Sequence, residues 1–464
     1  MMRLWKARIE ADAKSKYLGI VEALEADIYS GYVKAGDRLP SQRAIAGSLK
    51  VDLTTVTRAF NEARRRGLID ATTGRGSYVR QHVENKLISH TSGSRPLLDL
   101  SMNNPPQPES ADLQHHIPRS IAQLISGADR ILQLHYQDSA GNPHDRSAAS
   151  GWLKQTIENV TAERTLITSG AQSALYAILH CMAQPGDNIA CGEFVYPGLK
   201  SAAEQLGLIL QPLAMDEEGV IPFSFEQACR EQTIKAIYLV PTMDNPTTAT
   251  MSLVRRQQIV EMANEYDIII IEDDPYSPLQ TQTSKAIVDL AADRTWYIRT
   301  LSKCITPALR LAYVIAPSNS QALGLANVLR AISVMASPLM AALVSHWIYD
   351  GHINRFAEAI REENRLRQQI ASQFLAGMNF FRHPEGHHIW LQLPSCWQAN
   401  AFAEQATVLG VSVVACNNFG FSSHQRQAVR LSLGLSPDHA TLSQALSILR
   451  GLLVQPATTS HHII

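Results

Sequence analysis

Residues 295–313 read Thr-Trp-Tyr-Ile-Arg-Thr-Leu-Ser-Lys-Cys-Ile-Thr-Pro-Ala-Leu-Arg-Leu-Ala-Tyr, and they place one lysine after an apolar run. Ser302 precedes Lys303, and Arg310 follows it beyond Pro307. An amine that reacts with an aldehyde must lose its proton, which burial favours. A phosphate-bearing aldehyde cofactor also needs hydroxyl groups and a cation. The stretch offers all of these groups, although a Ser-Lys pair followed by an arginine is also common on solvated surfaces.

The composition is that of a globular protein with two or three domains. The 464 residues are 45% apolar and 18% charged. Residues 1–80 carry 15 Lys and Arg against 9 Asp and Glu, a net charge of +6, whereas the remainder carries 26 against 33, a net charge of −7. A basic head on an acidic body indicates a polyanionic partner for the head. Six cysteines without close pairing indicate a reducing, cytoplasmic compartment and no structural metal.

One segment, Ala331–Tyr349, contains no charged residue and is long enough to span a bilayer. Its serines, proline and histidine lead us to expect a buried helix pair there and no membrane span. The charged N-terminus also lacks the apolar run of a signal peptide.

The first 80 residues predict three helices and two short strands. Helical apolar spacing begins at Tyr17, Ser41 is placed to cap a second helix, and Asp52 is placed to cap a third. Strands are expected at Leu68–Ala71 and Ser77–Arg80, around a glycine-rich turn. This order is the plan of a winged helix-turn-helix domain.

The third helix is expected to expose Thr54, Thr55, Thr57 and Arg58, which suit phosphate and base-edge contacts in a DNA major groove. Arg75 lies at the tip of the predicted wing. These contacts and the basic balance favour double-stranded DNA as the partner. The alternative is a solvated three-helix module that binds protein.

This segment resembles the GntR-type winged helix domains. The matching stretches are Gly36-Asp-Arg-Leu-Pro-Ser-Gln-Arg43, Thr54-Thr-Val-Thr-Arg-Ala59, and Gly67-Leu-Ile69 with Gly74-Arg-Gly76. The resemblance implies DNA contacts from the wing and from four other residues, Arg38, Arg43, Thr54 and Thr55. The chain departs from the family at two positions that often hold arginine, where it has Leu53 and Thr57.

After a polar linker at 81–96, residues 97–464 alternate short apolar runs with helical patterns, which predicts an α/β domain with a mostly parallel sheet. Ligands in such sheets collect beyond the carboxyl ends of the strands. Five predicted strands end in polar groups: Ser169-Gly-Ala-Gln172, Tyr196, Asn245, Glu272-Asp-Asp274 with Tyr276, and Lys303 with Arg310. An anion-binding turn, a ring that can stack, an amide, a carboxylate and a lysine together are what pyridoxal phosphate (PLP) needs.

The body resembles the fold-type I aminotransferases, and the whole chain resembles the MocR/GabR subfamily, which fuses such a domain to a GntR-type head. The landmarks are Leu134-His-Tyr136, Gly141-Asn-Pro143, Ser169–Leu175, Tyr196-Pro-Gly198, Asn245-Pro-Thr247, Glu272–Tyr276, Ser302-Lys303, Leu309-Arg310 and Val429-Arg-Leu-Ser432. The resemblance implies a large domain with a mostly parallel sheet and a small α+β domain.

The resemblance also implies a role for each site residue. Lys303 would form the aldimine, Asp273 would pair with the pyridine nitrogen, and Tyr196 would stack on the ring. Asn245 and Tyr276 would bind the ring hydroxyl, and Tyr136 would come from a neighbouring subunit. Arg430 would take the α-carboxylate of an amino-acid ligand. The phosphate would be held by Ala171, Gln172, Thr300, Ser302 and Arg310. Metal ligands are not expected.

These expectations favour a homodimeric, PLP-dependent transcriptional regulator that senses PLP or an amino compound at Lys303 and binds an operator with repeated half-sites. Two alternatives stay open. One is a working aminotransferase whose head controls its own gene. The other is a scaffold that binds DNA and no cofactor. We rank the regulator first because a DNA-binding head adds nothing to transamination, and we expect no physiological turnover beyond residual transaminase activity.

Overall fold

The computed structural model describes residues 16–29, 33, 36–65, 68–72, 76–79, 98–126, 135–421 and 427–454. The chain divides into two compact units, Met1–Gly93 and Ser94–Ile464. The predicted linker at 81–96 and the predicted wing-tip contact Arg75 lie outside the described residues.

The N-terminal unit has the predicted winged helix-turn-helix plan. Its elements are α1 (Lys16–Tyr29), α2 (Gln42–Leu49), α3 (Leu53–Arg65), β1 (Ile69–Thr72) and β2 (Gly76–Val79). Ser41 caps α2 as expected, since its hydroxyl accepts a hydrogen bond from the Ala44 N–H at 3.2 Å. Val56 and Phe60 on α3 are buried in the core of this unit, and β1 pairs antiparallel with β2.

The second unit is built on a seven-stranded sheet. Its order is β4 (Thr165–Thr168), β12 (Ala312–Ile315), β11 (Thr295–Thr300), β10 (Ile269–Asp273), β9 (Ile234–Leu239), β5 (Asn188–Gly192) and β6 (Ile209–Leu213). Only β12 runs against its two neighbours among the paired strands of this sheet. The prediction of a mostly parallel sheet is therefore confirmed.

Helices bury both faces of this sheet. Adjacent residues on one strand, Ile270 and Ile271, belong to two different apolar clusters, as the alternation of side chains along a strand requires. This two-sided burial explains the unbroken isoleucine run of β10. The helices are α5 (Pro143–Leu153), α6 (Ala171–Met182), α7 (Pro197–Leu206), α8 (Pro222–Glu231), α9 (Leu253–Glu265), α10 (Ile287–Leu290), α11 (Asn319–Ser333) and α12 (Pro338–Tyr349).

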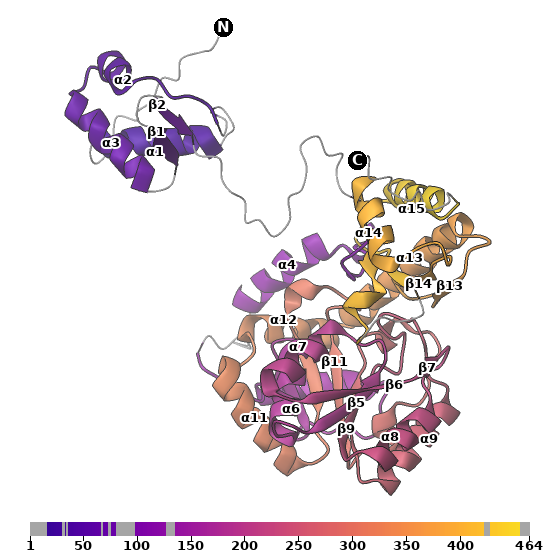
Figure 1. The fold of residues 1–464 in the computed structure, drawn as a ribbon. Coiled ribbons are helices and arrows are strands. Elements are labelled where there is room, and N and C mark those ends of the chain that lie inside the picture. Colours follow the sequence, from indigo (N-terminus) through magenta and orange to yellow (C-terminus); the bar gives the residue numbers. More distant parts are fainter. Residues whose placement is uncertain are drawn as a thin grey trace. The chain divides into compact units, whose positions relative to one another are not determined.

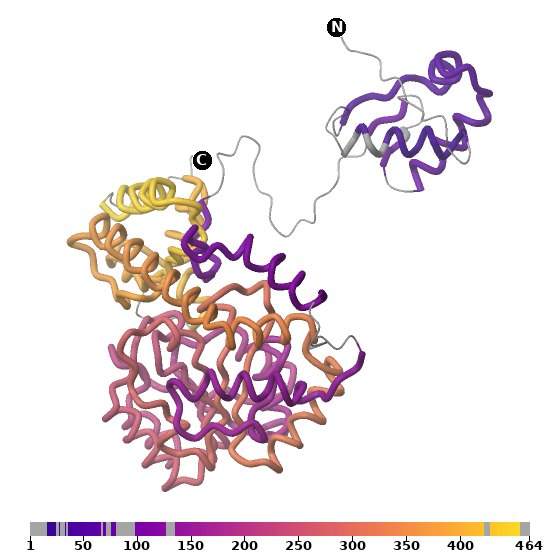
Figure 2. The backbone as a smooth tube through the Cα atoms, turned by 180° about the vertical axis from the view of Figure 1, so that it is seen from behind, coloured from indigo at the N-terminus to yellow at the C-terminus, as the bar shows by residue number. Residues whose placement is uncertain are grey.

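A smaller antiparallel sheet lies at one end of the second unit, where Figures 1 and 2 both show it in orange and yellow with its helices. Its order is β13 (Phe380–Arg382), β14 (His388–Gln392), β17 (Ala428–Ser432) and β16 (Val414–Ala415). Three helices accompany it: α13 (His352–Phe374), α14 (Ala399–Val408) and α15 (His439–Val454). The large and small parts of an aminotransferase fold are thus both present.

The remaining described elements are short apart from one helix. They are β3 (Leu98–Asp99), α4 (Leu113–Ser126), β7 (Met215–Asp216), β8 (Gly219–Val220), β15 (Val411–Ser412) and the 3₁₀ turns Glu109–Ala111, Ser277–Leu279, Pro307–Leu309 and Cys416–Asn418.

The uncharged segment Ala331–Tyr349 is divided between the end of α11 and the whole of α12, with a break at Val334. The expectation of two helices there is confirmed, but only α12 is largely buried, since Ala331 and Ile332 at the end of α11 are exposed. No helix in the described part of the chain combines the length and apolar character that a membrane span requires.

Candidate functional site

The polar groups predicted to follow the strands meet at one edge of the large sheet. β5, β9, β10 and β11 are parallel neighbours, and β4 runs the same way because β12 opposes it on one side and β11 on the other. Their carboxyl ends therefore lie at the same edge, which is where such sheets bind ligands.

Lys303 lies in the turn after β11, half-buried. Its Nζ donates a hydrogen bond to the backbone carbonyl of Asn103 at 2.5 Å. Burial lowers the pKa of Lys303 to about 8, and the guanidinium groups of Arg430 and Arg310 act in the same direction, whereas the Asp273 carboxylate opposes them. A substantial fraction of the amine is therefore unprotonated near neutral pH.

Asp273 ends β10 and is buried. Its Oδ2 accepts a hydrogen bond from the hydroxyl of Tyr238 at 2.7 Å, while its Oδ1 is buried with no hydrogen-bond partner among the described residues. Burial raises the pKa of Asp273 to about 6, although the Tyr238 hydroxyl lowers it. A buried acceptor without a donor is costly, and a protonated ring nitrogen is the donor that would satisfy it.

The two acids beside Asp273 have structural partners instead. Glu272 accepts a hydrogen bond from the backbone N–H of Ile287 at 3.0 Å. Asp274 accepts one from the hydroxyl of Tyr297 at 2.6 Å. Of the three acids expected to serve the cofactor site, only Asp273 therefore remains available to bind a ligand.

Hydrogen bonds also pair residues predicted to hold the ring hydroxyl and a ligand carboxylate. Asn103 Nδ2 donates to the hydroxyl oxygen of Tyr276 at 2.8 Å. Arg430 Nη1 donates to Asn245 Oδ1 at 2.8 Å, and Arg430 is only 7% exposed. Asn103 also accepts from Lys303 through its backbone carbonyl, and the Arg430 guanidinium acts on the pKa of both Lys303 and Tyr276, so these residues are neighbours.

The residues predicted to hold the phosphate also lie near one another. Gly170 precedes α6 with φ +92°, and a Cβ added to it would lie 3.1 Å from Arg310 Nη2. No side chain caps α6, so the N–H groups of its first turn, beginning at Ala171, are available to an anion. The hydroxyls of Thr300 and Ser302 lie 3.1 Å apart in the same region of chain as Arg310.

Tyr196 and Gln172 meet over Gly198. Gln172 Nε2 donates to the Gly198 carbonyl at 2.9 Å, and a Cβ on this glycine would lie 2.2 Å from a ring carbon of Tyr196. Burial raises the pKa of Tyr196, the Asp273 carboxylate adds to the rise, and the Arg310 guanidinium opposes it. The tyrosine ring is thus near both the acid and the predicted phosphate cation.

One predicted cofactor residue is not brought to this group within the single chain. Tyr136 is 81% exposed. Its contribution to a neighbouring subunit stays a prediction.

Sequence reasoning missed four residues of the site: Asn103, Tyr238, His387 and His388. Both ring nitrogens of His387 are buried without a hydrogen-bond partner among the described residues, and its ring lies 5.5 Å from that of Tyr276. His388 Nε2 lies 3.0 Å from the backbone oxygen of Asp244. The adjacent histidines were a sequence signal for His387 and His388 only; Asn103 and Tyr238 carry no such signal.

The DNA contacts predicted for the N-terminal unit are mostly exposed. Arg38, Arg43 and Thr54 are exposed, and Thr55 is partly exposed. Arg58 is exposed, and its guanidinium lies 4.7 Å from the centre of the Tyr17 ring.

Thr57, which was expected to be exposed on the third helix, is partly exposed, as Thr55 is. Its hydroxyl donates to Gln42 Oε1 and to the Leu53 carbonyl, both at 2.9 Å. The contact between α2 and α3 therefore uses the hydroxyl that was expected to face DNA.

Comparison with solved structures gives the same fold. An archaeal alanine:glyoxylate aminotransferase matches with a TM-score of 0.71 and 23% identity, over 78% of this chain and 91% of that one. A kynurenine aminotransferase from Pyrococcus horikoshii, solved in complex with PMP (pyridoxamine phosphate), matches with a TM-score of 0.71 and 22% identity over the same shares.

Among curated proteins, the uncharacterized HTH-type (helix-turn-helix) transcriptional regulator YdeF of Bacillus subtilis is 29% identical over 97% of this chain and 96% of its own length. The vitamin B6 salvage pathway transcriptional repressor PtsJ of Salmonella typhimurium is 28% identical over 82% of this chain and 86% of its own length. Residues 16–79 match the model of bacterial regulatory proteins of the gntR family. Since the model of aminotransferase class I and II matches residues 95–449, the greater part of the chain, this protein belongs to the aminotransferase class I and II family.

Proposed function

We propose that this protein is a PLP-dependent transcriptional regulator that binds DNA through its N-terminal unit and responds to PLP or an amino compound at Lys303. The observation that carries the proposal is the pairing of two features in one chain. Asp273 holds a buried, unsatisfied oxygen beside a lysine of lowered pKa, and the same chain begins with a gntR-type domain. Relatives along nearly the whole length are named transcriptional regulators.

PLP fits the residues that are present. When bound, it supplies an aldehyde that reacts with amines and a ring that withdraws electrons. Lys303 would provide the amine, and Asp273 would accept a hydrogen bond from the ring nitrogen. Asn245 and Tyr276 would contact the ring hydroxyl, and Tyr196 would cover a ring face. The phosphate would be held by Ala171, Gln172, Thr300, Ser302 and Arg310.

Arg430 is placed to recognise the carboxylate of an amino-acid effector. Its guanidinium is 7% exposed and already donates to Asn245. Burial lowers the pKa of Arg430 to about 10, so it remains charged at neutral pH. A bidentate carboxylate would compensate the charge. The effector can change DNA binding only if it binds two conformations of the chain unequally.

DNA recognition would come from α2, α3 and the wing, through Arg38, Arg43, Thr54, Thr55, Arg58 and Arg75. Two subunits that share Tyr136 across their interface would present two such heads to repeated half-sites. We place this regulator in the cytoplasm, as its role in transcription requires.

The proposal is tested by footprinting the full-length protein on the upstream region of its own gene. Reactions contain no ligand, PLP, or PLP with single amino acids and amines, and the Lys303→Ala variant is run beside them. We expect protection whose extent or position changes with at least one ligand, and a smaller ligand response in the variant. Protection that is absent, or that no small molecule changes, contradicts the proposal.

A working aminotransferase is the second candidate, because the sequence supplies every cofactor-binding group that the resemblance to aminotransferases implies. Steady multiple turnover with an amino donor and a keto-acid acceptor would favour it. A single burst equal to the protein concentration would favour the regulator.

A further inference from the structure

A second cavity lies behind the loop that carries Asn245. It consists of an outer chamber of about 620 Å³ and an inner recess of about 20 Å³. The two share Phe194, Met215 and Ala249 in their walls. The residues predicted to hold the cofactor line neither the recess nor the chamber.

The outer chamber has an aromatic wall. Phe194 and Trp390 pack edge to face with ring centroids 5.3 Å apart, and Phe381 also lines the chamber. The lining also includes polar and charged residues, namely Thr247, Thr248, Thr250, Asp216, Glu217, Arg382, His383 and Gln392. This wall suits the body of a small, partly apolar molecule.

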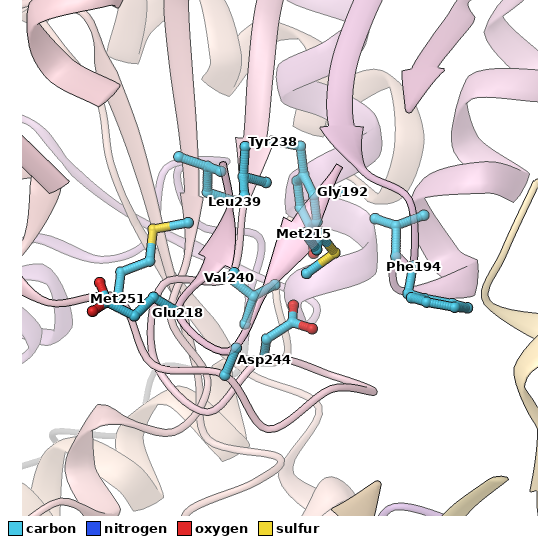
Figure 3. Close-up of a pocket in the computed structure, with 13 residues that line it drawn as sticks. Gly192, Phe194, Met215, Glu218, Tyr238, Leu239, Val240, Asp244 and Met251 are labelled. Carbon is cyan, nitrogen blue, oxygen red and sulfur yellow. The ribbon is translucent and has the colours of Figure 1, made fainter. Parts of the chain in front are cut away.

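The inner recess carries negative charge. The carboxyl groups of Asp244 and Glu218 line it, and no lysine, arginine or histidine does. Figure 3 shows the Asp244 carboxyl group beside Met215 and Val240, within the same space. The charged end of an occupant at this position must therefore be a cation.

Asp244 itself is a buried acid without a cation. It is 8% exposed, its Oδ2 accepts from the Thr247 hydroxyl at 2.6 Å, and no described lysine or arginine forms an ion pair with it. Burial raises the pKa of Asp244 to about 6, against the hydrogen bonds from Thr247. At neutral pH the group is largely ionised and poorly solvated, so a cation is the partner that would stabilise it.

We propose that the recess and chamber form a second ligand site, for a small organic amine whose ammonium group contacts Asp244 and whose apolar body lies against Phe194 and Trp390. The recess has room for about one water-sized group, which an ammonium group matches. The charge-assisted hydrogen bond and the aromatic rings are both features that recognise cationic nitrogen.

The site is linked to the cofactor residues by two short routes. Asp244 directly precedes Asn245, which accepts from Arg430. Tyr238 lines the recess and donates to Asp273. An occupant would therefore influence the cofactor site without touching it, provided that it binds two states unequally.

The test uses full-length Lys303→Ala dialysed free of PLP, so that no cofactor aldehyde is present for an amine to react with. Calorimetric titration with 2-phenylethylamine should show saturable binding, and the neutral isostere 2-phenylethanol should bind at least about tenfold more weakly. Adding Asp244→Asn should weaken amine binding about tenfold or more. Glu218→Gln is the matched control and should change it less, because the Glu218 side chain is 46% exposed and its carboxylate lies 3.9 Å from the Arg255 guanidinium.

A second variant tests whether the space itself, and not only the charge of Asp244, is needed for binding. Ala249→Leu leaves every charge in place and fills the wall that the recess and chamber share, so it should abolish amine binding. Circular dichroism and melting temperature verify that each variant is folded. No saturable amine binding, equal binding of amine and alcohol, or undiminished binding in Asp244→Asn or Ala249→Leu would each overturn the proposal.

Discussion

Replacing Tyr238 with Phe removes one hydroxyl from behind the Asp273 carboxylate and leaves the ring in place. The hydroxyl donates to Oδ2 at 2.7 Å in a fully buried setting. Burial holds the pKa of Tyr238 well above its ordinary value, so this group is always a donor. We therefore expect the substitution to raise the pKa of Asp273 beyond about 6, since a donor that stabilises the ionised form is lost.

The magnitude follows from the strength of the bond. A hydrogen bond to a charged group contributes about 1.5–3 kcal/mol, which corresponds to roughly a ten- to hundredfold change in the acid dissociation constant of Asp273. Only the ionised carboxylate pairs with a protonated ring nitrogen. The variant should thus bind PLP roughly five- to fiftyfold more weakly at pH 6, where Asp273 of the unchanged protein is about half ionised, and the difference should shrink as the pH rises and both proteins become ionised.

The assay is the dissociation constant of PLP, measured by equilibrium dialysis from pH 6 to pH 9 for both proteins. The pH dependence of PLP itself cancels in the ratio. Tyr297→Phe is the matched control, because it removes a 2.6 Å hydrogen bond from the neighbouring carboxylate of Asp274, which pairs with structural partners. A ratio that is constant with pH, or that the control reproduces, would refute the reasoning.

Three further predictions concern the phosphate turn, a buried ion pair and the reactive amine. Gly170→Ala should weaken PLP about tenfold but leave unphosphorylated pyridoxal unaffected, because the added Cβ displaces Arg310; equal losses for both ligands would contradict this. Arg256→Ala should reduce the free energy of unfolding in urea by about 3–5 kcal/mol, since Glu272, 3.8 Å away, would lose its buried cation; a loss below 1 kcal/mol would argue against the pair. The rate of covalent PLP capture should rise with pH through about 8, as Lys303 loses its proton. Stopped-flow absorbance measures this rate, and a midpoint in the ordinary lysine range would contradict a lowered pKa for Lys303.

The sequence predicted which segments form strands and which polar groups follow them, because both depend on local patterns. The isoleucine run before Asp273 and the apolar run before Lys303 each predict a buried strand. In a parallel sheet the carboxyl ends of such strands must meet at one edge. The site prediction therefore needed no knowledge of distances.

The errors and omissions concern groups whose roles depend on partners far along the chain. Asn103 contacts Tyr276 across 173 positions, and its carbonyl contacts Lys303 across 200. Thr57 was expected to face DNA, but its hydroxyl binds Gln42 on the preceding helix. No periodicity encodes such pairings, because they arise only when separate elements pack.

Local periodicity, glycine turns and charge balance were sufficient to predict the winged helix, the mostly parallel sheet and a lysine directly after one of its strands, since each depends on neighbouring residues. Packing alone selected which acid of residues 272–274 keeps a buried oxygen without a donor among the described residues. It also buried Asp244 at the end of a second cavity. Electrostatic environment is a sum over groups brought near in space, so the pKa of a lysine or an aspartate is a property of the folded chain.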